Sequence, residues 1–208
     1  MTQEKRLAHR PAHQAKQDAI LAAARAEFFE QGYAAASIER IAQTANVSKV
    51  TIYNHYQGKE NLFSAVINGE CSKMRGELGD LSGEPADLRT ELLAFGHSMM
   101  NFLGSIDIVR FDRRMAAEVE RYPEMGELFL NAGPRQMQTM IAEMMSAAMQ
   151  EGHLEKADPK AAAAHLYGII KGFADIEWRF GTDPDSAVQQ TSIEDAVDRF
   201  LKAYAPTD

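Results

Sequence analysis

The stretch that decides the fold is NVSKVTIYNHYQGKENL, residues 46–62. Its middle is built from Val, Thr, Ile, Tyr and Asn, which are mediocre helix formers, and residues 46–59 contain no Asp or Glu. Ser48 is a suitable N-cap, and at about 100° per residue Ile52 and Tyr56 fall on one side of a helix. The opposite side carries Val50, Thr51, Tyr53 and Asn54. We therefore predict a short helix held by one narrow apolar edge, with an outward face free of carboxylates.

The charge of the chain is unevenly distributed. Of 208 residues 45% are apolar, and the formal net charge of −8 argues against a protein that coats nucleic acid indiscriminately. Residues 1–60 nevertheless hold eight Lys and Arg against six Asp and Glu, whereas residues 61–208 hold fourteen against twenty-four. A mildly basic N-terminal part indicates that one end meets a polyanion. A solvated tail is the alternative for the first residues.

Targeting and redox signals are absent from the sequence. Cys71 is the single cysteine, so an internal disulfide is excluded and no oxidising compartment is required. The N-terminus lacks the apolar segment of a secretory signal, and AAAAHLYGII, residues 161–170, is too short to span a bilayer. We therefore expect a soluble cytoplasmic protein without a membrane partner.

The apolar periodicity is helical along the whole chain, and no run shows the alternation of a strand. We expect all-α architecture with about nine helices. They lie near residues 14–31, 38–45, 48–56, 59–78, 85–104, 106–120, 124–152 with an interruption at Gly133-Pro134, 158–180 and 186–204. A loop is expected at GDLSGEP, residues 79–85.

The second and third expected helices have the spacing of a helix-turn-helix. Ser37 is placed to cap the second helix and Ser48 the third, with a three-residue turn at residues 45–47. Asn46 suits this turn because Asn tolerates left-handed backbone angles. In a helix-turn-helix the second helix enters the major groove, where a carboxylate would meet phosphate repulsion. Other helical corners share this spacing, so the spacing alone does not decide the function.

Residues 19–67 as a whole resemble the DNA-binding domain of the TetR family of bacterial repressors. The matching motifs are Phe28-Phe29, Gly32-Tyr33, Ser37-Ile38, Ile41-Ala42, Ala45-Asn46-Val47-Ser48, Tyr53-Asn54-His55-Tyr56 and Lys59-Glu60-Asn61-Leu62. Asn46 stands where the family usually has Gly, and Val50 where Gly, Ala or Pro is common. Asn adopts the same backbone angles, whereas Val50 is expected to change which base is read.

The resemblance implies a set of DNA-binding residues: Ser37, Ser48, Lys49, Val50, Thr51, Tyr53, Asn54, His55 and Lys59. Ser37 would present its hydroxyl and backbone N–H to a phosphate. Lys49, Val50, Thr51 and Asn54 would read base edges. Tyr53, His55 and Lys59 would contact phosphates. The alternatives are a surface tyrosine, a histidine packed on Tyr56, and an ordinary first-turn lysine.

The C-terminal part resembles the AefR-like type within this family, through Gly133-Pro134 and Gly152-His153-Leu154. The resemblance implies a homodimer formed by the last two long helices. A stripe at helical spacing in that region contains small residues, which permit close helix approach. The stripe consists of Ala161, Ala164, His165, Gly168, Gly172 and Phe173. The expected domains are a basic arm at residues 1–13, a three-helix DNA-binding domain at 14–62, a connecting helix at about 59–78, and a ligand-binding and dimerisation domain at 79–208.

Family members typically bind a small effector in this second domain, which releases double-stranded operator DNA. Methionines adapt to varied ligand shapes, and the candidate pocket residues are Phe95, Met99, Phe102, Phe111, Met115, Met137, Met140, Met144 and Tyr167. His97 and Arg114 are candidate polar anchors. A packed histidine with satisfied hydrogen bonds is the alternative for His97. An ordinary apolar core is the alternative for this set, and a surface ion pair is the alternative for Arg114.

Other functional classes lack support in the sequence. We find no phosphate-binding loop, no HExxH and no nucleophile motif, so we expect no enzyme and no catalytic residue. The six histidines form no close ligand pair and Cys71 has none at metal-site spacing, so we expect no metal and no cofactor. The main hypothesis is a dimeric repressor released from a palindromic operator by an apolar or aromatic effector. The alternative is an activating or architectural DNA-binding protein without an effector.

Overall fold

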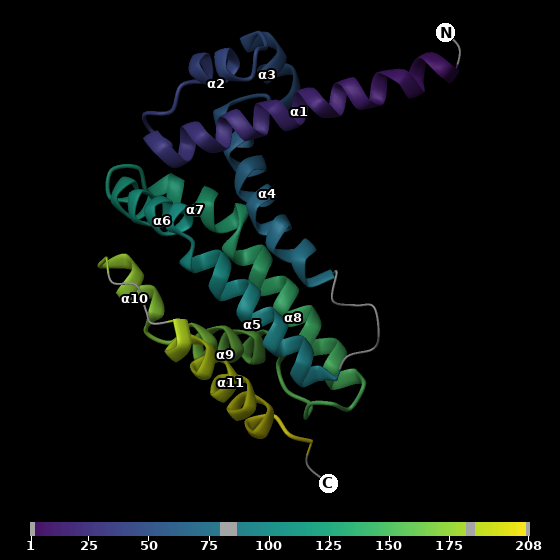
Figure 1. Ribbon diagram of the computed structural model, residues 1–208, viewed down its shortest axis with the longest axis vertical. Helices are drawn as coiled ribbons and strands as arrows, with labels where there is room; N and C mark the ends of the chain where they lie inside the picture. The colour runs from purple at the N-terminus through teal and green to yellow at the C-terminus, as the bar shows by residue number, and fades with distance from the viewer. Residues whose placement is uncertain (1–2, 80–86, 182–185, 207–208) are drawn as a thin grey trace. The chain divides into compact units, whose positions relative to one another are not determined.

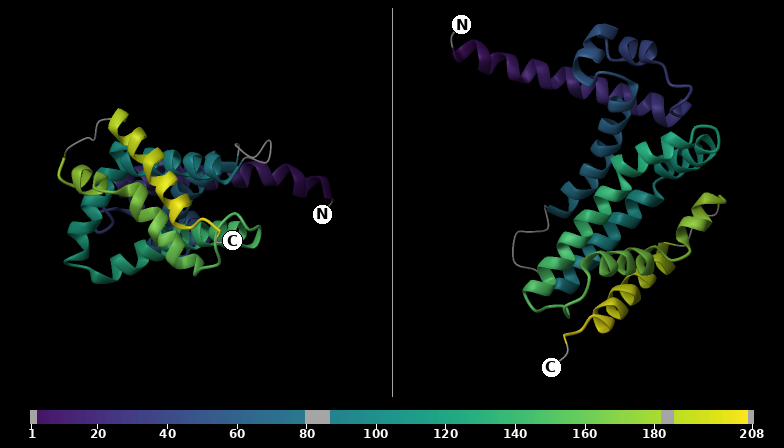
Figure 2. Two further views of the ribbon diagram at one scale, coloured as in Figure 1. Left: turned by 90° about the horizontal axis from the view of Figure 1, so that it is seen from below. Right: turned by 180° about the vertical axis from the view of Figure 1, so that it is seen from behind.

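The computed structural model describes residues 3–79, 87–181 and 186–206, and side chains within 13–73, 87–181 and 192–206 (Figures 1 and 2). All regular structure in these residues is helical, which confirms the all-α expectation. The helices are α1 (Gln3–Gln31), α2 (Ile38–Thr44), α3 (Lys49–Tyr56), α4 (Lys59–Gly79), α5 (Leu88–Gly104), α6 (Ile106–Val119), α7 (Pro123–Ala132), α8 (Pro134–Gln150), α9 (Pro159–Lys171), α10 (Ala174–Arg179) and α11 (Ser186–Ala203). Most of the expected loop at residues 79–85 lies outside the described residues.

The chain forms two compact units that are not contiguous in sequence. Unit 1 comprises Met1–Gly69 and Arg113–Ala132, and unit 2 comprises Glu70–Asp112 and Gly133–Asp208. Helices α4 and α6 therefore contribute residues to both units. The expected boundary near residue 79 did not anticipate that residues 113–132 group with the N-terminal helices.

Unit 1 has a core of apolar residues from α1, α2, α3 and α4. Phe28, Ile41, Ile52 and Phe63 are each almost fully buried, and the rings of Phe28 and Phe63 meet edge-on with centroids 5.2 Å apart. Helix α1 begins at Gln3 instead of near residue 14. Residues 3–13 include favourable helix formers such as Lys5, Arg6 and Leu7, but also Pro11, which is unfavourable inside a helix, so propensity alone does not explain why the backbone of the expected arm continues the helix.

The turns that shape the helix-turn-helix follow the sequence expectations. Ser37 accepts a hydrogen bond from the backbone N–H of Arg40, and Ser48 accepts one from that of Thr51, so both are N-caps. Asn46 has φ 52°, the left-handed conformation expected for this turn. Gly32 ends α1 at φ 82°, a conformation that glycine adopts without strain.

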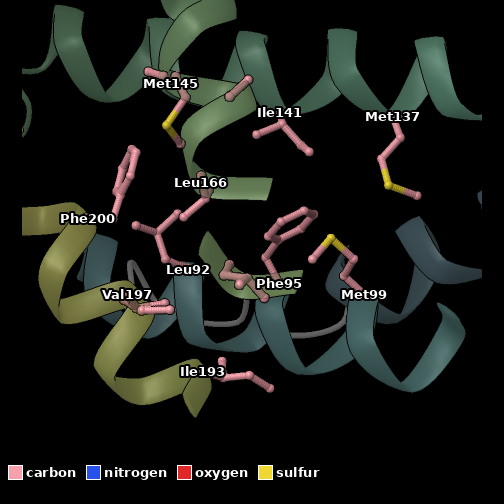
Figure 3. Close-up of a cluster of buried hydrophobic side chains, with 14 of the residues drawn as sticks. Leu92, Phe95, Met99, Met137, Ile141, Met145, Leu166, Ile193, Val197 and Phe200 are labelled. Atoms are coloured by element: carbon pink, nitrogen blue, oxygen red, sulfur yellow. The ribbon is translucent and has the colours of Figure 1, made fainter. Parts of the chain in front are cut away.

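Unit 2 is built around one apolar cluster supplied by α5, α8, α9 and α11. Figure 3 shows Phe95 and Met99 of α5 pointing towards Met137, Ile141 and Met145 of α8. Leu92, Leu166, Ile193, Val197 and Phe200 extend the cluster, and all of these side chains are buried. Because thioether and aliphatic side chains fill irregular space without directional bonds, this core is held mainly by apolar burial.

The segment expected as one helix over residues 158–180 is broken. Helix α9 ends at Lys171, Gly172 adopts φ 50°, and the separate helix α10 starts at Ala174. The prediction of a continuous helix was wrong because Gly172 was interpreted as a small residue for helix approach, whereas its backbone angles end the helix. This break and the expected one at Gly133 give more helices than the nine predicted.

Within the described residues, no single helix is both long and apolar enough to cross a membrane. Helices α5 and α6 together reach the required length and composition, but they are bent by 63° at their junction. The same residues contain no group of three or more His, Cys, Asp or Glu side chains that could hold a metal ion.

Candidate nucleic-acid interface

Helix α3 presents the face that the sequence predicts. Ile52 is buried to 1% exposure beneath the helix and Tyr56 is half-buried beside it. On the other side Val50 is 66% exposed and Tyr53 is 51% exposed, although both are large apolar or aromatic side chains. Asn54 is exposed between them. Exposed Val and Tyr side chains on a helix whose opposite face is packed in the core are typical of a contact surface.

The N-terminus of α3 is organised by two hydroxyl groups. The Ser48 hydroxyl accepts a hydrogen bond from the Thr51 N–H at 3.1 Å and lies 2.9 Å from the Thr51 hydroxyl. The hydroxyl of Thr51 is therefore occupied at the cap. Ser48 itself is exposed, so it can serve the helix and a phosphate at the same time.

A carboxylate from α2 reaches this surface, which the sequence analysis missed. The Lys49 ammonium donates to Oε1 of Glu39, and the Ser37 hydroxyl donates to Oε2 at 3.2 Å. The hydrogen bond from Lys49 lowers the pKa of Glu39 below its ordinary value. Residues 46–59 contain no Asp or Glu, but Glu39, ten positions before Lys49, forms an ion pair with it. No local pattern in the sequence indicates this pairing.

The start of α2 is fixed by a glutamate from α1. Glu27, whose side chain is 13% exposed, accepts hydrogen bonds from the Ser37 N–H at 2.9 Å and from Arg40 Nε at 2.8 Å. Arg40 also donates to the Ala35 carbonyl at 2.8 Å. Burial alone would raise the pKa of Glu27, but the hydrogen bonds from Arg40 and Ser37 outweigh it and lower that pKa. The Ser37 N–H, expected to face a phosphate, is instead bound to Glu27.

Lys59 lies against the loop between α1 and α2. Its ammonium donates to the Ala34 carbonyl at 3.1 Å and lies 4.7 Å from the centre of the Tyr33 ring. Burial lowers the pKa of Lys59, while the carboxylates of Glu118 and Glu27 act in the opposite direction. Burial, with the charges of Glu60 and Glu124, raises the pKa of Tyr33 to about 12. A phosphate contact by Lys59 would use its remaining donors, and it stays a prediction.

His55 is partly covered by a histidine from α1. The rings of His13 and His55 meet edge-on with centroids 4.8 Å apart, and the Tyr56 ring is 6.2 Å from His55. His13 is exposed and His55 is half-buried. The packing alternative for His55 is therefore present in the structure, and its role at a phosphate stays a prediction.

Residues distant in sequence complete unit 1. The Arg114 guanidinium donates to the carbonyl of Phe29 in the last turn of α1, and Glu118 accepts the Ala34 N–H at 3.1 Å. Arg114 thus satisfies one of the carbonyls that a helix end leaves unpaired. This contact is to backbone and is not the surface ion pair expected as the alternative, and a role of Arg114 at a ligand stays a prediction. Arg114 and Glu118 lie one turn apart on α6, and their contacts span more than eighty residues.

Comparisons with known proteins identify the arrangement. Residues 20–66 match the model of the tetR family of bacterial regulatory proteins, and residues 90–206 match the AefR-like transcriptional repressor C-terminal domain. The second match alone covers more than half of the chain. The chain belongs to the TetR family. The fold class and the resemblance predicted from sequence are thereby confirmed, and the chain is a DNA-binding transcriptional regulator of the repressor type.

Relatives of this TetR-family chain match nearly its whole length. YvkB of Bacillus subtilis, an uncharacterised HTH-type transcriptional regulator, is 25% identical over 190 residues, which cover 89% of this chain and 95% of YvkB. A TetR-family regulator from Mesorhizobium loti has 26% identity and a TM-score of 0.75, covering 93% of this chain and 98% of the other. The flavonoid-responsive regulator FrrA has 29% identity and a TM-score of 0.72 with the same coverage.

In this TetR-family fold, the residues expected at an effector pocket separate into groups. Phe95, Met99 and Met137 are buried in the cluster of unit 2. Phe102, Met140, Met144 and Tyr167 are partly buried and pack against that cluster. Phe111 and Met115 are also buried, and Met115 belongs to unit 1. The set therefore does not lie within one unit, and its role at a ligand stays a prediction.

Proposed function

We propose that this chain is a dimeric repressor that reads a palindromic operator through α3 and releases it when a small apolar or aromatic effector occupies unit 2. The observation that carries the proposal is the exposed face of α3, where Val50, Tyr53 and Asn54 face outward from a helix fixed by Ile52. Such a helix fits a major groove, in which amide side chains pair with adenine and methyl groups meet thymine.

The proposed reading residues are tested by measuring binding to duplexes selected from a random library. Asn54→Ala should relax the preference at one base pair of each half-site and leave binding to a scrambled duplex unchanged. Asn101→Ala is the matched control, because Asn101 is an exposed asparagine of α5 in unit 2. A uniform loss on all duplexes with Asn54→Ala would assign Asn54 to the DNA backbone and contradict base reading.

The proposed phosphate contact of Tyr53 has its own test. Tyr53→Ala should weaken binding to all duplexes alike and should reduce the discrimination between them little, since phosphate contacts carry no sequence information. Tyr122→Ala is the control, because Tyr122 is similarly exposed but follows α6. Equal affinities of Tyr53→Ala and the unchanged protein would remove Tyr53 from the interface.

The proposed dimer surface lies on α9 and α10. Ile169 of α9 is exposed, as are Phe173, Ile176 and Phe180 in and beside α10, and Phe173 and Phe180 are the two most exposed large hydrophobic side chains described. Ala164, His165 and Gly168 are exposed on the same side of α9, whereas Ala162, Leu166 and Ile170 face the core. A second copy covering these residues by two-fold symmetry would give the assembly two copies of α3, one for each half-site of a palindromic operator whose half-sites lie about 34–36 Å apart.

Sedimentation equilibrium tests this surface. Phe173→Glu should convert the dimer to monomer, because a charge would be buried without a partner in the interface. Ile106→Glu, at an exposed apolar residue of α6, should leave the dimer intact. A Phe173→Glu protein that remains dimeric would contradict this location.

The proposed effector class follows from the Met and Phe side chains of unit 2, which are soft and apolar. It is also supported by FrrA, which is described as flavonoid-responsive. Titration of a flavonoid panel should displace the selected duplex and change the fluorescence of Trp178, the only tryptophan, which is buried in unit 2. Displacement without any change in Trp178 emission or in thermal stability would argue against binding in unit 2.

A further inference from the structure

Two residues expected to contact DNA converge on one carboxylate. Glu39 in the first turn of α2 accepts the Lys49 ammonium on Oε1 and the Ser37 hydroxyl on Oε2. The side chains of Glu39 and Lys49 are 62% and 52% exposed, so the cluster lies at the surface. The carboxylate thus accepts from two donors that could otherwise bind a phosphate oxygen.

Stability does not account for this cluster. An exposed ion pair contributes little to stability, because water screens the charges and the side chains lose freedom. An acid in the first turn of α2 also interacts favourably with the helix dipole, but that interaction needs no contact with Lys49. Glu39 beside α3 therefore weakens the attraction of this surface to phosphate and adds little to the stability of the fold.

The cluster has an electrostatic consequence for binding to arbitrary DNA. Paired with Glu39, the Lys49 ammonium adds no net charge to the surface and contributes little to counterion release, which dominates non-specific affinity. Specificity increases when a group lowers the affinity for every incorrect DNA sequence and the correct sequence compensates for that cost with a favourable contact. In the major groove, the cost of placing a carboxylate near phosphates can be compensated by a hydrogen bond from a base amino group. The amino group that donates to Glu is N4 of cytosine.

We propose that Glu39 is a specificity-determining residue of the DNA-binding surface. It holds Lys49 and Ser37 in a neutral cluster that binds arbitrary phosphates weakly, and in the operator its carboxylate accepts a hydrogen bond from a cytosine amino group. This inference rests on the proposed function, since it requires that α3 and the first turn of α2 enter the major groove.

The test compares the full-length protein with Glu39→Gln on its selected duplex and on a scrambled duplex over a range of salt concentrations. The substitution should tighten binding to the scrambled duplex and steepen its salt dependence by about one counterion per subunit. The ratio of specific to non-specific affinity should fall about tenfold, and selection with the variant should lose a cytosine preference in each half-site. Glu39→Asp, which keeps the charge, should retain the shallow salt dependence.

Two controls make the outcome decisive. Glu30→Gln removes the same charge from an exposed site in the last turn of α1 and should change neither the slope nor the ratio. Adding Lys49→Ala to Glu39→Gln should cancel the steeper slope, because the released ammonium is then absent. A steeper slope that survives this second substitution, or Glu39→Gln behaving as the unchanged protein, overturns the inference.

Failure of the proposed function itself has a separate signature. An unchanged protein that selects no duplex at low salt would contradict operator reading before any variant is measured. An unchanged protein that selects a duplex, together with a Glu39→Gln variant of equal specificity, would remove only the role of Glu39. Far-UV circular dichroism of each variant verifies that the helices are retained.

Discussion

The loop between α1 and α2 and the core of unit 2 are held together by different forces. In unit 1, the backbone of residues 34–37 is fixed by directional hydrogen bonds. The carboxylates of Glu118 and Glu27 accept from the N–H groups of this segment, and Arg40 and Lys59 donate to its carbonyls. In unit 2, Leu92, Phe95, Met99 and their neighbours pack with no polar side chain in the cluster. Hydrogen bonds require defined angles and distances, whereas the stabilisation from apolar burial depends mainly on the area and volume that are buried.

This difference suits the two tasks. A reading helix must be held in a defined orientation to match a groove, so the loop that leads to it benefits from directional contacts. A core of Met and Phe side chains accepts changes of shape as long as volume is kept. Substitutions should therefore act through lost volume in the core of unit 2 and through lost hydrogen-bond geometry in the α1–α2 loop.

The largest effect is expected from removing volume in unit 2. Phe95→Ala deletes an aromatic side chain that is 1% exposed and should lower the free energy of unfolding by about 3–5 kcal/mol. Urea unfolding followed by Trp178 fluorescence measures this, because Trp178 belongs to the same cluster. Ile106→Ala, at a side chain 56% exposed in α6, is the control and should cost little. Similar losses from both substitutions would contradict an apolar core centred on Phe95.

A smaller but geometric effect is expected at Glu27. Glu27→Ala leaves the Ser37 N–H and Arg40 without their acceptor and should cost about 1–3 kcal/mol. Because the pKa of Glu27 is lowered by folding, its contribution is present above the ordinary value of 4.5 and is lost as the pH falls through the lower folded value. Hydrogen exchange of residues 32–44 at pH 7 and pH 4 measures both. Glu30→Ala is the exposed control on the same helix, and equal exchange in both variants would sink the role of Glu27.

The next effect is expected at Gly32. Gly32→Ala places a methyl group at a φ of 82° and about 2.0 Å from Oε1 of Glu118, so the backbone is strained and the carboxylate must move. We expect a loss of about 1–2 kcal/mol and weaker operator binding. Gly69→Ala in α4 has open space around it and should be neutral or stabilising by about 0.5–1 kcal/mol. If both substitutions behave alike in thermal unfolding, the loop does not depend on this geometry.

The smallest effect is expected from a change of shape in the core. Met145→Leu keeps the volume of a fully buried side chain and should cost less than about 1.5 kcal/mol. The same urea titration with Trp178 fluorescence measures it. A cost approaching that of Phe95→Ala would mean that unit 2 is as geometrically demanding as unit 1, which would remove the contrast between them.

Much of the fold follows from local signals. Ser37, Asn46 and Ser48 were predicted as two caps and a turn because capping and left-handed backbone depend on the residue and its immediate neighbours. The outward orientation of α3 followed from helical periodicity, which requires only a few residues. These features, with the motifs of residues 19–67, were sufficient to identify the family.

The remaining features depend on contacts between distant residues. The pairing of Glu39 with Lys49, and of Arg114 and Glu118 with the α1–α2 loop, leaves no trace in a single sequence, because any exposed acid or base has the same local pattern. The break at Gly172 was missed because glycine serves both for close helix packing and for helix termination. The early start of α1 was missed because Pro11 lies within residues 3–13, and proline is unfavourable inside a helix.

The grouping of Arg113–Ala132 with the N-terminal helices has a practical consequence for protein engineering. A chimeric regulator joined just after residue 69 would exchange unit 2 but would also discard Arg114 and Glu118, whose side chains hydrogen-bond to the backbone of Phe29 and Ala34. A chimera intended to keep the DNA preference of this protein should therefore include both Met1–Gly69 and Arg113–Ala132. The N-terminal fragment alone contains α3 but lacks the residues of α6 that bind the α1–α2 segment.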